Sequence, residues 1–75
     1  MNNGLTDNEL RYIIERMLGN AADAVKDAAT DGSDFTKGRK FAYYEMLDTI
    51  KSELRAHGQE PSDYGLDMNL EQKIL

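Results

Sequence analysis

The sequence of 75 residues contains no cysteine, one histidine and one proline. The missing cysteines exclude disulfide bonds and thiolate metal sites, and one histidine cannot build a histidine-based zinc site. No uncharged stretch approaches the roughly 18 apolar residues that a membrane span requires. These absences predict a chain that holds no cofactor or metal and that does not insert into a membrane.

Basic residues are also too few to favour a polyanionic partner. Lysine and arginine number 9 against 14 aspartate and glutamate residues, which gives a net charge of −5. This negative balance disfavours direct binding to nucleic acids and to anionic membranes. The N-terminus lacks the basic start and the apolar run of a secretory signal, so we expect a cytoplasmic protein.

The length allows one small domain that spans residues 1–75. A hydrophobic core of this size rarely supplies more than about 3–5 kcal/mol, and natural chains of this size add staples or partners. Because disulfides and metal sites are excluded, association with another chain is what remains. No residue pattern pairs a nucleophile with a base, so we expect no enzymatic activity.

Helical periodicity begins near the N-terminus. Thr6 and Glu9 have the spacing of a capping box, which marks the start of a helix. Apolar side chains then recur at alternating steps of four and three residues, and Gly32 is a typical helix stop. The pattern predicts a helix over residues 7–31, with a weak point at Gly19 and an apolar stripe of Leu10, Ile14, Met17, Ala21, Ala24 and Ala28.

A second periodic segment follows a short turn, and Gly58 ends it. The pattern predicts a helix over about residues 36–57, whose cap falls at one of three residues, Ser33, Asp34 or Thr36. Its apolar stripe consists of Tyr43, Leu47, Ile50 and Leu54. Two helices joined by a short turn form an antiparallel hairpin, so the expected fold class is all-α.

The remaining segment, residues 59–75, is too apolar for a solvated linker. Its large apolar side chains are Tyr64, Leu66, Met68, Leu70, Ile74 and Leu75. We expect this tail to dock on a helix of its own chain or of a neighbouring chain. We further hypothesise that it folds back across a ridge formed by Phe41 and Tyr44.

The two apolar stripes are more than so short a chain can enclose, which favours a homodimer. We expect two hairpins to combine into a four-helix bundle with knobs-into-holes packing. The expected oligomer interface consists of Leu10, Ile14, Met17, Ala21, Tyr43, Leu47, Ile50 and Leu54.

A different side of the second predicted helix is a candidate surface for another partner. On a helical wheel, Phe41 and Tyr44 point away from the apolar stripe and share a ridge with Asp48 and Arg55. Aromatic side chains are enriched at the hot spots of protein interfaces. The alternative is that the apolar tail covers this ridge.

The stretch Gly38–Leu54 (GRKFAYYEMLDTIKSEL), with His57 and Gly58 after it and Asp63–Asp67 (DYGLD) in the tail, resembles uncharacterised short proteins of phages and mobile elements of Gram-positive gut bacteria. Such proteins are often accessory or anti-defence factors. The resemblance implies a non-enzymatic role in phage or element biology, and it transfers no functional residue.

Two functions fit these patterns. The first is a helical protein–protein interaction module, which forms a homodimer and binds a host or element-encoded protein. The alternative is an anti-defence inhibitor, similar to anti-CRISPR proteins, whose acidic surface occupies the basic nucleic-acid channel of a host nuclease. That acidic surface would consist of Glu9, Asp23, Asp27 and Asp31.

Overall fold

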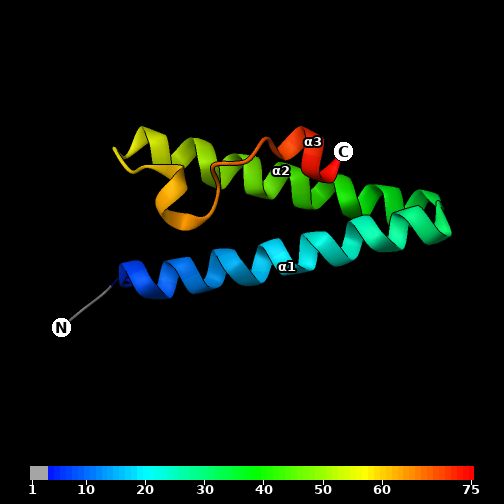
Figure 1. Ribbon diagram of the computed structural model, residues 1–75, viewed down its shortest axis with the longest axis horizontal. Coiled ribbons are helices and arrows are strands. Elements are labelled where there is room, and N and C mark those ends of the chain that lie inside the picture. Colours follow the sequence, from blue (N-terminus) through cyan, green and yellow to red (C-terminus); the bar gives the residue numbers. More distant parts are fainter. Residues whose placement is uncertain (1–3) are drawn as a thin grey trace.

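The computed structural model describes residues 4–75 and is built from two long antiparallel helices and a folded tail (Figure 1). Helix α1 spans Asp7–Asp31 and helix α2 spans Asp34–Ala56. The tail contains a 3-10 turn, η1 (Pro61–Tyr64), and a short helix, α3 (Leu70–Ile74). Residues 4–75 include no strand, so the predicted all-α hairpin is confirmed. The expected lack of a secretory signal rests partly on residues 1–3, which lie outside the described residues.

Helix α1 has the bounds that its sequence pattern predicts. The Glu9 N–H donates to Thr6 Oγ1 at 3.1 Å, and the Thr6 N–H donates to Glu9 Oε1 at 2.8 Å, which completes the capping box. The helix continues without a break through Gly19. It ends where Gly32 adopts a left-handed conformation (φ 66°) and donates its N–H to the Ala28 carbonyl at 2.9 Å.

Helix α2 begins two residues earlier than predicted because Ser33 is its N-cap. Ser33 Oγ accepts the Thr36 N–H at 3.3 Å, and Thr36 Oγ1 donates back to the Ser33 carbonyl at 3.0 Å. Two residues therefore separate the helices, and α2 starts at Asp34. So short a connection makes the two helices antiparallel neighbours.

The hydrophobic core lies where the tail packs into the space between α1 and α2 (Figure 1). One residue from each of the three segments, Ile14, Leu47 and Leu66, is fully buried. The other core residues are Ala21, Leu54, Tyr64, Leu70 and Ile74. The tail thus docks on its own chain and supplies half of the core cluster.

Two basic side chains fasten the tail to the helices. Arg11 of α1 donates from Nε to the Asp63 carbonyl at 2.7 Å, and Lys51 of α2 donates from Nζ to the Met68 carbonyl at 2.8 Å. Between these two points Gly65 takes a left-handed conformation (φ 77°), which ends η1 and turns the chain toward α3. The tail is therefore held by directional bonds as well as by apolar packing.

The hypothesis that the tail covers the ridge of Phe41 and Tyr44 is wrong for Phe41. Tyr44 is half-buried beside the tail, but Phe41 remains 47% exposed. The two rings are neighbours, with centroids 6.0 Å apart. The tail misses Phe41 because its apolar side chains enter the deeper space between the helices, where they bury more surface.

Replacing Leu66 by alanine tests whether the tail is part of the core. We expect Leu66→Ala to lower the free energy of unfolding by about 2–5 kcal/mol, because it removes a fully buried side chain and leaves a cavity. The matched control is Leu75→Ala, since Leu75 is 51% exposed in the same tail. Urea unfolding followed by circular dichroism measures both variants. Equal stability of the two variants would contradict the described packing.

Candidate functional site

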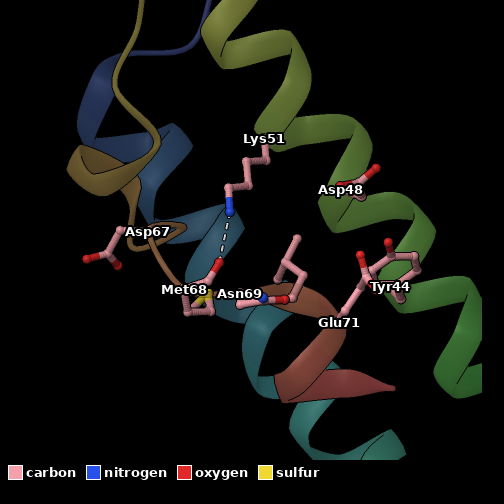
Figure 2. Close-up of a pocket in the computed structure, with 8 residues that line it drawn as sticks. Tyr44, Asp48, Lys51, Asp67, Met68, Asn69 and Glu71 are labelled. Carbon is pink, nitrogen blue, oxygen red and sulfur yellow. Dashed lines mark hydrogen bonds between the residues drawn. The ribbon is translucent and has the colours of Figure 1, made fainter.

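The most polar cleft lies between α2 and the tail, and Figure 2 shows its lining side chains. Its volume is about 360 Å³, and its titratable side chains are Tyr44, Asp48, Lys51, Asp67 and Glu71. Figure 2 shows that the carboxylates of Asp67 and Glu71 point in different directions. Lys51 already bonds the Met68 carbonyl. Within residues 4–75, no group of three potential ligand side chains is arranged to hold a metal ion.

The electrostatics of this cleft affect Tyr44. Desolvation, and then the negative charges of Glu71 and Asp48, raise the pKa of the Tyr44 phenol above its ordinary value. The phenol therefore stays neutral at neutral pH, with the carboxylates of Glu71 and Asp48 near it. The arrangement offers a polar recess beside an exposed aromatic ring, Phe41.

Most of the tail packs on one side of the hairpin, and only its first part, at Gln59 and Tyr64, also borders Leu10 and Ile50. On α1 its neighbours include Arg11 and Leu18, and on α2 they include Tyr44 and Lys51. Successive residues of a helix are about 100° apart around its axis. On α1, Ile13 therefore lies about 140–160° from Arg11 and Leu18. On α2, Met46 lies about 140–160° from Tyr44 and Lys51. Both helices therefore carry apolar side chains on the side away from most of the tail.

We call this side the open face and define it by six apolar residues. Met46 is 42% exposed and Ile13 is 40% exposed. A shallow groove on this face brings Met17 of α1 together with Met46, Ile50 and polar residues of α2, without any residue of the tail. The open face consists of Leu10, Ile13, Met17, Tyr43, Met46 and Ile50. All of these except Ile13 and Met46 are half-buried.

The predicted oligomer interface divides into two groups of four. Ile14, Ala21, Leu47 and Leu54 are buried in the core of the single chain, so a partner that docks on the folded hairpin would not touch them. The other four are partly accessible and belong to the open face: Leu10, Met17, Tyr43 and Ile50. Ile13 and Met46 were not among the predicted interface residues, because they lie beside the stripe through which the two helices contact each other.

The predicted partner ridge on α2 is only partly free. Asp48 and Arg55 are exposed, as is Phe41, whereas Tyr44 is half-buried against the tail. One aromatic ring with two flanking charges therefore remains accessible. This is a smaller apolar surface than the open face.

The residues of the predicted acidic surface are largely engaged within the chain. Glu9 completes the capping box, Asp31 accepts a hydrogen bond from Ser33 Oγ at 3.3 Å, and Asp27 pairs with Arg39 at 2.8 Å. Asp23 is exposed. Three of these four carboxylates thus have a structural role in α1 or across the hairpin.

An apolar recess continues the open face toward the end of the hairpin where α1 begins. It is lined by Leu10, Ile50, Leu54 and Tyr64, with His57 at its edge. The Tyr64 hydroxyl donates to Asp7 Oδ1 at 3.4 Å, and Arg11 lies over the Tyr64 ring at 5.4 Å. Burial, and then the Asp7 carboxylate, raise the pKa of the Tyr64 phenol.

Comparisons with protein-family models, with curated proteins and with solved structures found no match. The resemblance to short proteins of phages and mobile elements therefore stays a prediction. Among the described helices, none is long and apolar enough to cross a membrane.

The burial of the Tyr64 phenol, together with its contact with Asp7, predicts a loss of stability at alkaline pH. The pKa of Tyr64 is raised in the folded chain above its ordinary value of 10.0, so its contribution is complete below about pH 10 and is lost as pH rises through the folded pKa. We expect the urea midpoint of the native chain to fall more steeply above pH 10 than that of Tyr64→Phe. Tyr12→Phe, at an exposed ring, is the control and should keep the native pH profile. A native profile in Tyr64→Phe would show that ionisation of Tyr64 does not cause the alkaline loss of stability.

Proposed function

We propose that this chain is a non-enzymatic helical protein–protein interaction module that acts as a homodimer through its open face. The observation that carries the proposal is the presence of six apolar side chains from two helices on a face that the tail borders only at Leu10 and Ile50. Contiguous apolar surface of this kind is typical of protein interaction sites.

The dimensions of the molecule suit such an interface. Its principal extents are 45, 24 and 14 Å, so the hairpin is a flat body with two broad faces. A stable interface buries roughly 800 Å² on each partner, and a face of 45 by 24 Å is large enough to provide that area. Two hairpins packed through their open faces would place four long helices in one bundle, with the two tails on the outside.

The fully buried centre of the interface would contain Ile13 and Met46. Both side chains are about two-fifths exposed in the single chain, so association removes much of their apolar surface from water. At about 25 cal/mol per Å² of buried apolar surface, this face contributes more to association than an exposed ion pair does. The expected association is therefore weakly dependent on salt.

The acidic-inhibitor alternative loses one of its four charges to the ion pair of Asp27 with Arg39, and its other carboxylates, Glu9, Asp23 and Asp31, are exposed. It remains distinguishable by experiment, since binding through an acidic surface weakens steeply as the ionic strength rises. The setting implied by the sequence resemblance, a phage or mobile element, is compatible with an interaction module that later binds a host or element-encoded protein.

Charged substitutions on the two faces of α2 test this proposal. We expect the native chain to sediment as a dimer at micromolar concentration and Met46→Glu to weaken association at least tenfold, because a carboxylate would be buried without a partner. Phe41→Glu is the matched control, since Phe41 has a similar exposure (47% against 42%) on the side away from the open face. Analytical ultracentrifugation measures the dissociation constants.

Two outcomes would contradict the proposal. A native chain that stays monomeric and folded through the micromolar range would refute the homodimer. A dimer that Phe41→Glu dissociates and Met46→Glu leaves intact would place the contact on the ridge of α2 instead.

A further inference from the structure

A stripe of side chains along α2 contains the three α2 residues of the open face, Tyr43, Met46 and Ile50, and extends beyond them in both directions. Starting at Arg39, its members recur at alternating steps of four and three residues, which is the spacing of a coiled-coil seam. We call this stripe the α2 seam, and it consists of Arg39, Tyr43, Met46, Ile50, Glu53 and His57. Phe35, one turn before Arg39, is 77% exposed on the same side of the helix.

The charges of the α2 seam are symmetric in position and opposite in sign. Arg39 precedes Met46 by seven residues, and Glu53 follows Met46 by seven residues. Tyr43 and Ile50 lie between them, so a short apolar centre has a cation at one end and a carboxylate at the other. A helix with this pattern is complementary to its own reversed copy.

Both charged groups are accessible to a second partner. Arg39 pairs with Asp27 through Nη1 at 2.8 Å and lies over the Tyr43 ring at 5.8 Å, with 34% of its side chain exposed. This contact leaves other guanidinium donors for a second carboxylate. Glu53 is 67% exposed, and its neighbour on the seam is His57 at 3.5 Å.

We propose that two copies of this chain dock antiparallel, α2 against α2, with Met46 at the two-fold axis. This inference rests on the proposed function and specifies its geometry. Arg39 then lies opposite Glu53 of the second copy, and Tyr43 lies opposite Ile50 of the second copy. The exposed ring of Phe35 is covered by the end of the second α2, near His57.

Antiparallel docking is favoured over parallel docking by charge. A parallel pair would place each Arg39 opposite the other Arg39 and each Glu53 opposite the other Glu53, which is repulsive at both ends. The helix dipoles also favour antiparallel docking, because the negative C-terminal end of one α2 then lies beside the positive N-terminal end of the other. A two-fold axis also makes the contact self-limiting, so the assembly closes as a dimer.

Single engineered cysteines test this register, because the native chain contains none. On mild oxidation of the full chain, we expect most of the Met46→Cys variant to become a disulfide-linked dimer of twice 8.5 kDa. The reason is that the two thiols meet at the two-fold axis. Arg39→Cys and Glu53→Cys should each remain uncross-linked alone and should cross-link to each other when mixed. Phe41→Cys, on the other side of α2, is the control.

The cross-linking patterns separate the failure of this inference from the failure of the proposed function. If Arg39→Cys and Glu53→Cys each cross-link alone, the copies dock parallel and the register is wrong, although the homodimer stands. If Met46→Cys cross-links no more than Phe41→Cys while the native chain sediments as a dimer, another surface holds the copies together. A native chain that does not dimerise overturns both proposals.

Discussion

The fold depends on the packing of the tail between the two helices, because the tail is the third segment that contributes to the core. A pair of helices buries only one narrow stripe of each against the other, and a core this small is marginal. Leu66 of the tail belongs to the same core cluster as Ile14 of α1 and Leu47 of α2, and all three side chains are fully buried. Because this packing joins residues from opposite ends of the chain, the hairpin and the tail are expected to lose their structure together.

The position of the tail also decides which surface is available for function. Arg11 and Lys51 fasten the tail to one side of the hairpin through bonds to backbone carbonyls. The opposite side keeps Ile13 and Met46 in solvent. The same packing that makes a single chain stable thus leaves an apolar face uncovered, and that asymmetry is the physical basis of the proposed interaction.

The helices were predictable from sequence because their signals are local. The capping box of Thr6 and Glu9, the stop at Gly32 and the four-and-three spacing placed α1 at residues 7–31, where the structure has it. The tail was predictable as a docked segment from its apolar content. Its path was not, because the choice between the ridge at Phe41 and the space between the helices depends on three-dimensional packing. For the same reason half of the predicted oligomer interface, including Ile14 and Leu47, is core in the single chain.

In the proposed dimer, one face of a tail-stabilised hairpin accepts a second copy along its full length. Small-angle X-ray scattering of the unaltered chain measures particle mass and longest dimension together. We expect twice the 8.5 kDa of the chain with a longest dimension close to the 45 Å of one copy, because antiparallel copies overlap. A monomeric mass, or a dimer nearly twice as long as one copy, would contradict it.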